Sequence, residues 1–335
     1  MRVSAALPIG VAALLFESAR RRRAAESRLT EMLERAGYGE VILPILDYVE
    51  PYEALLTAAS RSELYRFIDR DGEELALRGD FTPMLARLLA PRLTALSLPL
   101  RVFYRGDVIR YVEERAGRQR ELYQVGAELL GVPSEPGQAA EREVLRLFLA
   151  ALAAGGSAGS LAGSGGEIQV VLGFAGALDR LLLGSGADPV GLAAAVARRE
   201  RGVVRTACPA LLPVVETGLP NRPEDLGPEA AGSLTDLLAL REELAAGFPA
   251  VRLAVDLAEF ARHSLDPRLS VDAGERSYYD GIVFHAFAGA AALPVGGGGR
   301  YDSLFRRLGA ELPAVGFSIS LERLLEAGAA REDRP

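Results

Sequence analysis

The sequence of 335 residues has no lysine, so arginine supplies every one of its 38 basic side chains. This absence excludes a Schiff-base lysine, a lysine general base and the phosphate-binding lysine of a P-loop. Two histidines, His263 and His285, and one cysteine, Cys208, are too few for a zinc site of cysteine and histidine ligands, and no internal disulfide can form. We therefore expect a cytoplasmic protein without a metal site.

Long hydrophobic runs and an excess of positive charge are also absent. The 45 acidic residues outnumber the basic ones and give a net charge of -7, so no global attraction to nucleic acid or anionic membranes is expected. Pro8 and Gly10 interrupt the apolar stretch 3–16, and the arginines at 20–23 follow it, whereas a secretory signal carries its charge first. No other run reaches the roughly 18 apolar residues of a membrane span, so we expect a soluble protein.

Hydrophobic periodicity and turn residues predict strands near both ends of the chain and helices between them. The predicted strands cover residues 41–46, 64–68, 74–77, both sides of 102–130, 251–257, 278–287 and the start of 315–325. The predicted helices cover residues 17–36, a segment from Pro83, 141–153, 174–183, 234–246 and the end of 315–325. This distribution favours an α+β fold on a mainly antiparallel sheet, not an alternating βαβ array.

Three local signals concern helix starts and loops. Asp80 or Thr82 is the expected cap of the helix that begins at Pro83, because proline in the first turn loses no hydrogen bond. The Gly/Ser/Ala tract 155–166 has the composition of a flexible surface loop. The glycine run 296–299 is not followed by lysine and a hydroxyl residue, so we expect a turn or a close backbone approach there and no phosphate loop.

Five motifs, in order over residues 38–325, resemble those of histidyl-tRNA synthetase, a class II aminoacyl-tRNA synthetase. They are the segment from Leu77 to Thr82 with Ala86-Arg87, the segments 104–110 and 117–128 (motif 2), 278–284 (the histidine-binding loop), 298–302, and 316–324 (motif 3). The resemblance implies a class II synthetase-like core over residues 1–325, with its sheet flanked by helices. It also implies a mostly helical insertion at about 175–250 and a C-terminal tail at 326–335.

The chain departs from the synthetase pattern where the synthetase activates its amino acid. Arg110 is followed by Tyr111 and Val112, whereas motif 2 of the synthetase reads Arg-x-Glu. Leu122 takes the place of the aromatic residue that stacks on adenine, and Gly274 takes the place of the catalytic arginine. The sequence ends soon after motif 3, so we expect no anticodon-binding domain and no tRNA binding.

A class II core with these departures resembles the regulatory subunit of ATP phosphoribosyltransferase. That resemblance implies a non-catalytic protein that the short-form catalytic subunit requires in the first step of L-histidine biosynthesis, with L-histidine as a feedback effector. It also implies a homodimer within a hetero-octamer, with no cofactor. Two alternatives stay open: a truncated histidyl-tRNA synthetase-like enzyme that adenylates histidine, and a scaffold that binds no small ligand.

The matched motifs supply side chains for free histidine. The resemblance implies that Asp80, Thr82 and Gln124 surround the ammonium group, and Arg110 is the remaining candidate for the carboxylate. Because Gln124 and Glu128 are four residues apart on a predicted strand, their side chains should point to the same face.

The imidazole of histidine needs a polar partner at each nitrogen. The resemblance implies Glu128 at one nitrogen and Tyr279 at the other, with Tyr278 and Tyr301 as walls. Taken singly, Glu128 would equally suit a buried structural carboxylate, and the tyrosines would suit core aromatics. His263 and His285 are interpreted as packing residues.

Overall fold

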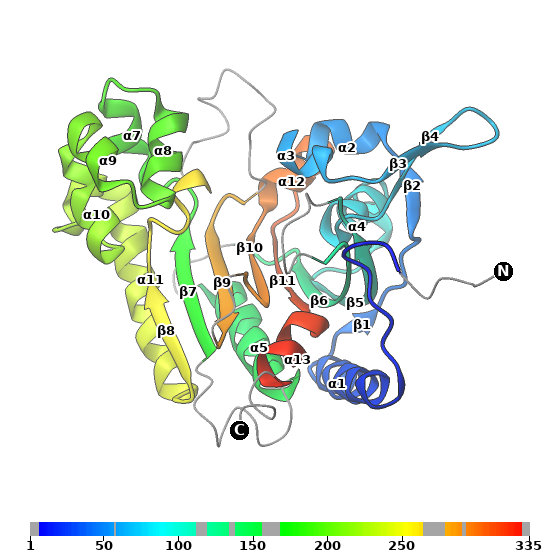
Figure 1. Cartoon of the computed structure of the whole chain (residues 1–335). Helices are drawn as coiled ribbons and strands as arrows, with labels where there is room; N and C mark the ends of the chain where they lie inside the picture. The colour runs from blue at the N-terminus through cyan, green and yellow to red at the C-terminus, as the bar shows by residue number, and fades with distance from the viewer. Residues whose placement is uncertain are drawn as a thin grey trace.

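The structure contains two β-sheets (Figure 1). The computed structural model describes residues 7–56, 58–111, 119–133, 138–155, 168–263, 279–289 and 293–329. The strands are β1 (Gly39–Glu40), β2 (Leu46–Tyr48), β3 (Arg66–Ile68), β4 (Glu74–Leu77), β5 (Leu100–Ile109), β6 (Glu121–Leu130), β7 (Ile168–Phe174), β8 (Val251–Val255), β9 (Ile282–Ala288), β10 (Gly296–Arg300) and β11 (Ala314–Ser320). The large sheet has the order β1-β5-β6-β11-β10-β9-β7-β8, and the small sheet β2-β4-β3. Only β1/β5 and β7/β8 pair in parallel among these strands, so the predicted, mainly antiparallel α+β fold is confirmed.

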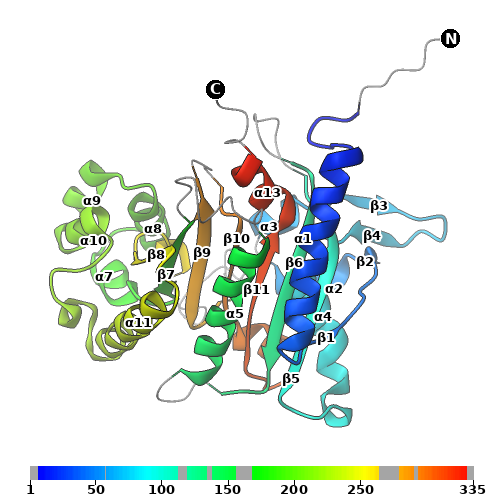
Figure 2. The ribbon, with the colours of Figure 1, turned by 90° about the horizontal axis from the view of Figure 1, so that it is seen from below.

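Helices cover both faces of the large sheet. They are α1 (Phe16–Arg35), α2 (Glu50–Leu55), α3 (Ala58–Ser62), α4 (Phe81–Leu89), α5 (Ala139–Gly155), α7 (Asp179–Gly184), α8 (Pro189–Ala197), α9 (Arg201–Ala207), α10 (Leu212–Thr217), α11 (Pro228–Gly247), α12 (Asp302–Arg307) and α13 (Leu321–Ala329). Helices α1, α5 and α13 lie against one face (Figure 2). Helices α7 to α11 lie between β7 and β8 in the sequence and gather at one end of the molecule (Figure 1).

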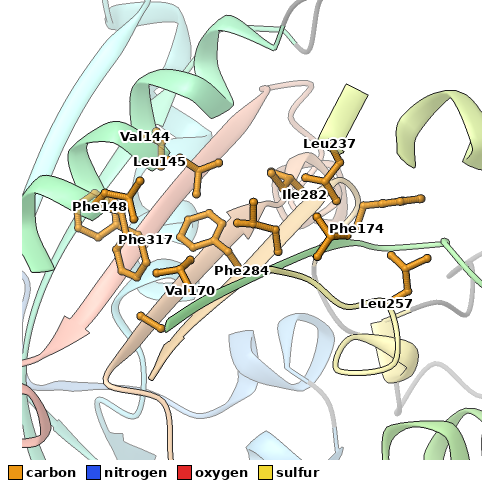
Figure 3. Close-up of a cluster of buried hydrophobic side chains, with 14 of the residues drawn as sticks. Val144, Leu145, Phe148, Val170, Phe174, Leu237, Leu257, Ile282, Phe284 and Phe317 are labelled. Atoms are coloured by element: carbon orange, nitrogen blue, oxygen red, sulfur yellow. The ribbon is translucent and has the colours of Figure 1, made fainter. Parts of the chain in front are cut away.

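The main core lies between the large sheet and the α1/α5/α13 layer. The ring of Phe148 on α5 lies 5.0 Å from the ring of Phe284 on β9 and 5.2 Å from that of Phe317 on β11 (Figure 3). All three rings are buried, and their tilted arrangement is one that aromatic pairs prefer. No helix in the described parts of the chain has the length and apolar character needed to cross a membrane.

Several sequence predictions are confirmed element by element. The helices expected at 17–36, 141–153 and 234–246 are α1, α5 and α11. The two sides of 102–130 form the antiparallel pair β5/β6, and 64–68 with 74–77 contains the antiparallel pair β3/β4. Of the Gly/Ser/Ala tract 155–166, Gly155 ends α5, and residues 156–166 lie outside the described residues.

The helix expected from Pro83 begins two residues earlier, at Phe81. Asp80 is its cap, and the Asp80 carboxylate accepts a hydrogen bond of 3.1 Å from the Thr82 amide. This acceptor satisfies one of the free amides at the helix start, so the first turn can form ahead of the proline. Of the two expected caps, Asp80 is the one observed.

The strand expected at 41–46 is wrong, since residues 41–45 connect the two sheets and only Leu46 lies in β2. The carbonyl oxygens of Leu43 and Pro44 accept hydrogen bonds from the Arg78 guanidinium at 2.7 and 2.8 Å. A buried arginine side chain thus takes the hydrogen bonds that a neighbouring strand would otherwise make.

The helix expected at 174–183 is also wrong at its start, and its apolar beginning belongs to β7, which the sequence did not predict. Phe174 ends this strand, Gly176 turns with a φ of 78°, and the helix begins at Asp179. A short apolar run does not distinguish a buried strand from a buried helix. The turn expected at 296–299 is likewise a strand, β10, but the expected close approach is confirmed because a Cβ at Gly298 would overlap the backbone of Gly316.

Candidate functional site

Five of the predicted site residues meet on the face of the large sheet opposite α1 and α5. Along β6, Val125, Ala127 and Leu129 point into the main core. Alternation along a strand therefore places Gln124 and Glu128 together on the other face, as predicted.

Three hydroxyl groups hold the Glu128 carboxylate, whose side chain is buried. Its Oε1 atom accepts hydrogen bonds from the Thr82 hydroxyl at 2.8 Å and from the Tyr104 hydroxyl at 3.1 Å. Its Oε2 atom accepts one from the Tyr301 hydroxyl at 2.6 Å. Donors from β5, α4 and the residue before α12 thus converge on one carboxylate of β6.

Glycines in neighbouring strands make room for this cluster. Gly316 lies directly opposite Glu128 in the β6/β11 pair, and a Cβ at that position would overlap the Glu128 Oε2 atom. A Cβ at Gly126 would lie 2.5 Å from the ring of Tyr104. The position of the carboxylate and of one of its donors therefore depends on two residues without side chains.

The buried position changes the acidity of the site. Burial raises the pKa of Glu128 to about 7, while the hydrogen bonds from Tyr301, Thr82 and Tyr104 act in the opposite direction. Burial, followed by the charge of Glu128, raises the pKa of the Tyr104 hydroxyl well above its ordinary value, so this group stays a donor. Glu128 therefore changes its charge near neutral pH.

A small cavity of about 30 Å³ lies beside Glu128. Its lining residues are Asp80, Thr82, Glu128, Tyr279, Gly297, Gly298, Tyr301, Gly316, Phe317 and Ser318. This volume is enough for one or two water molecules, so an imidazole ring requires neighbouring side chains to move. Five of the eight predicted site residues line this one cavity.

Two of the other three predicted residues, Arg110 and Gln124, do not line this cavity. Arg110 donates to the Gly79 carbonyl at 2.6 Å and lies 3.6 Å from the Asp80 carboxylate. The residue expected to bind the histidine carboxylate is thus paired with a residue expected to bind the ammonium. Gln124 is buried further along β6 and does not line the cavity. Tyr278 lies outside the described residues, as does Gly274.

Tyr279, which lines the cavity, contacts His263. The ring of His263 contacts that of Tyr279 edge-on at 5.7 Å, and burial followed by the charge of His285 lowers the pKa of His263 to about 4, so it is neutral. The His285 Nδ1 atom lies 3.2 Å from the Glu259 carboxylate. His263 is thus a packing residue, as interpreted, and it supports Tyr279.

Sequence reasoning missed Tyr104 and Gly316 as parts of the site. Both lie within the matched motifs, but their roles depend on the strand register that brings them to Glu128. The position of Gly316 inside the strand-like run 314–320 was the available signal, since glycine inside a strand often marks a close approach.

A larger cavity of about 510 Å³ lies on the α1 side of the same hairpin. Its walls include Arg22 on α1, Asp107 on β5 and Glu322 on α13, and the Arg22 guanidinium lies 3.4 Å from the Glu322 carboxylate. None of the predicted site residues lines it. This larger cavity and the converging motif residues therefore lie in two different places.

Leu122, which takes the place of the residue that stacks on adenine in a synthetase, and two residues of motif 3 make contacts within this chain. Leu122 is buried against Phe81, Tyr104 and Val108. The Arg323 guanidinium of motif 3 donates to the Pro294 carbonyl at 3.0 Å, and the neighbouring Glu322 accepts from the Tyr123 amide at 2.8 Å.

Comparison with known proteins shows the family to which the chain belongs. The family model described as histidyl-tRNA synthetase matches residues 10–324, so the chain belongs to the histidyl-tRNA synthetase-like class II family. It is 36% identical over 335 residues to the ATP phosphoribosyltransferase regulatory subunit of Moorella thermoacetica, covering 96% of this chain and 81% of that protein. The chain belongs to the family of ATP phosphoribosyltransferase regulatory subunits.

Other similar proteins carry two kinds of name. The histidine–tRNA ligase of Pyrobaculum calidifontis is 34% identical, over 90% of this chain and 70% of that protein. A histidine–tRNA ligase subunit from Alicyclobacillus acidocaldarius has a TM-score of 0.75 at 28% identity, covering 99% of this chain and 100% of that one. A chain of the ATP phosphoribosyl transferase (HisG:HisZ) complex from Thermotoga maritima has a TM-score of 0.63 at 21% identity, covering 90% and 97%, and shares the fold.

Proposed function

We propose that this chain is a non-catalytic regulatory subunit that binds a short-form ATP phosphoribosyltransferase and is required for its activity in the first step of L-histidine biosynthesis. The relatives named as regulatory subunits support this proposal. The shared fold with a chain of the HisG:HisZ complex agrees with it. The proposed assembly is a homodimer of this chain within a cytoplasmic hetero-octamer that does not bind tRNA.

L-Histidine is the proposed effector, and the cavity beside Glu128 is its proposed site. The observation that carries this part is the buried Glu128 carboxylate, placed with Thr82 and Tyr279 around one cavity. A carboxylate surrounded by hydroxyl groups suits an imidazole N–H, which can replace one of the hydroxyl donors. Asp80, Thr82 and Gln124 are the proposed partners of the ammonium, and Arg110 is the proposed partner of the carboxylate. Tyr278 and Tyr301 are the proposed walls of the histidine site.

The loss of amino-acid activation is supported by two positions that depart from the synthetase pattern. Leu122 fills a buried apolar cluster instead of offering an aromatic face for adenine. Gly274 takes the place of the catalytic arginine of the synthetase, and removing one such preorganised contact typically costs about 10²–10³ in rate.

The second candidate function is adenylation of histidine, which the similarity to the ligase of Pyrobaculum calidifontis favours. It predicts histidine-dependent exchange of pyrophosphate into ATP by the isolated chain. The regulatory proposal predicts no exchange above background.

Co-purification with a short-form catalytic subunit, followed by a mass determination, tests the regulatory proposal. We expect one complex whose mass contains both chains in equal numbers. Separate elution of the two proteins, with pyrophosphate exchange by this chain alone, would favour the ligase reading instead.

A further inference from the structure

The segment 256–263 joins the helices inserted between β7 and β8 to the wall of the small cavity. It follows β8 and ends in a short 3₁₀ helix, Ala261–His263. Its buried side chains are those of Leu257, Ala258, Phe260 and Ala261. One end of the segment contacts the inserted helices, and the other end contacts the cavity wall.

Arg199, which lies between α8 and α9, holds the first end. Its guanidinium donates to the Val214 and Val215 carbonyls of α10 at 3.2 and 2.8 Å and forms an ion pair with the Asp256 carboxylate. The Arg199 backbone has a φ of 57°, a left-handed conformation that few residues other than glycine adopt. Such a conformation persists where the surrounding contacts fix it, so Arg199 is held firmly between α10 and Asp256.

Asp256 in turn fixes the start of the segment. Its carboxylate accepts hydrogen bonds from the Ala258 amide at 3.0 Å and from the Glu259 amide at 3.3 Å, and an aspartate side chain closes turns in this way. The Leu257 amide donates at 2.7 Å to the carbonyl of Gly218, the residue that follows α10. The segment therefore begins on contacts that also hold α10.

The other end of the segment lies against Tyr279, which lines the cavity beside Glu128. The rings of His263 and Tyr279 are 5.7 Å apart in an edge-to-face arrangement. The Tyr279 ring also contacts β10, since a Cβ at Gly299 would lie 2.8 Å from it. Because β10 has a hydrogen-bonded strand on each side, its contact is fixed, and the variable contact of Tyr279 is the one with His263.

The middle of the segment is tightly packed. The ring of Phe260 lies over Gly173 of β7, where a Cβ would come within 2.3 Å of it, and 4.9 Å from the ring of His285. The His285 Nδ1 atom lies 3.2 Å from the Glu259 carboxylate of the same segment. Closely packed interiors transmit strain, so a change at Asp256 reaches the far end of the segment.

We infer that the segment 256–263 positions Tyr279 and thereby couples the inserted helices to the histidine affinity of the cavity, with Arg199 and His263 as positioning residues. This inference rests on the proposed binding of histidine and concerns its regulation. Coupling between two sites is reciprocal. A partner that displaces α8–α10 therefore changes the histidine affinity, and histidine changes the affinity for that partner by the same factor.

Calorimetry with L-histidine on single and double variants of the full chain tests the coupling. Tyr279→Phe removes the hydroxyl proposed to bind the imidazole and should weaken binding about 3–10-fold. Arg199→Met should weaken binding by a similar factor, but it should have little further effect in the Tyr279→Phe background, because both changes act through one contact. The matched control is Arg201→Met, which breaks an exposed ion pair with Glu216 among the same helices and should leave the affinity unchanged.

Two variants at His263 distinguish positioning from a merely structural role. Because His263 is neutral, His263→Phe loses no charge and keeps a ring against Tyr279, so it should retain the histidine affinity. His263→Ala removes the ring and should weaken binding as Arg199→Met does. A loss of stability alone would lower the urea midpoint without changing the histidine affinity of the folded chain.

The outcomes separate this inference from the proposed function. A wild-type chain that does not bind histidine would overturn both. Histidine binding that Arg199→Met and His263→Ala leave unchanged would overturn the coupling alone. The coupling would also be overturned by additive losses in the double variant, by equal losses in both His263 variants, or by a similar loss in Arg201→Met. If circular dichroism shows that Arg199→Met does not fold, the two His263 variants decide.

Discussion

Replacing Glu128 by glutamine should change how the stability of the protein depends on pH. Burial raises the pKa of Glu128 from 4.5 to about 7, and the hydrogen bonds from Tyr301, Thr82 and Tyr104 offset only part of that effect. In the unfolded chain the carboxyl group regains its ordinary pKa. Between these two values the folded state holds more protons than the unfolded state, so stability falls as the pH rises.

The size of the effect follows from the two pKa values. Since one pKa unit corresponds to roughly 1.4 kcal/mol, ionised Glu128 costs the folded state on the order of 3 kcal/mol above pH 7. The corresponding stability is fully present below the unfolded pKa and is lost as the pH rises through about 7. Glutamine keeps the size of the side chain without a titrating proton, so the variant should not show this loss.

Urea denaturation from acidic to mildly alkaline pH measures the difference directly. The free energy of unfolding of the wild type, minus that of Glu128→Gln, should fall by about 3 kcal/mol across this range. Glu311→Gln is the control, because the Glu311 side chain is 82% exposed, and its curve should run parallel to that of the wild type. Parallel curves for wild type and Glu128→Gln would mean that the pKa of Glu128 is not raised in the folded protein.

Two further substitutions test the packing around the site. Gly316→Ala should lower the free energy of unfolding by about 1–3 kcal/mol, because its methyl group overlaps the Glu128 carboxylate. Gly247→Ala, which meets no atom within 4 Å, is its matched control, and an equal urea midpoint for the two variants would contradict the expected overlap. Arg300→Met should cost about 3–5 kcal/mol, because the buried Glu141 carboxylate loses the donor that lies 2.6 Å from it. Arg35→Met breaks an exposed pair and should change stability by less than about 1 kcal/mol, so a similar loss in both arginine variants would show that burial does not matter here.

The parts of the fold with strong local signals were predictable from the sequence. The β5/β6 hairpin has β-branched and aromatic residues on both sides of a charged loop, and α1 has a regular apolar spacing closed by Gly37. The segment 41–46 was predicted wrongly and the strand at 168–174 was not predicted, because the conformation of both segments depends on distant partners. Arg78 takes the carbonyls of Leu43 and Pro44, and β7 is a strand because it lies between β8 and β9.

The candidate site shows the same division between local and distant information. The motif residues Thr82, Glu128 and Tyr301 were identified by resemblance, and the structure brings them into one hydrogen-bonded cluster. The sequence could not show that Gly316 faces Glu128, because strand register across the sheet is a tertiary property.

The proposed regulatory role is best tested by the rate of the short-form transferase, measured alone, with this chain, and with this chain plus L-histidine. We expect the chain to raise the rate and histidine to lower it again, with a weaker histidine effect for Glu128→Gln. A transferase rate that responds neither to the chain nor to histidine would mean that this chain is not its histidine-sensing regulatory subunit.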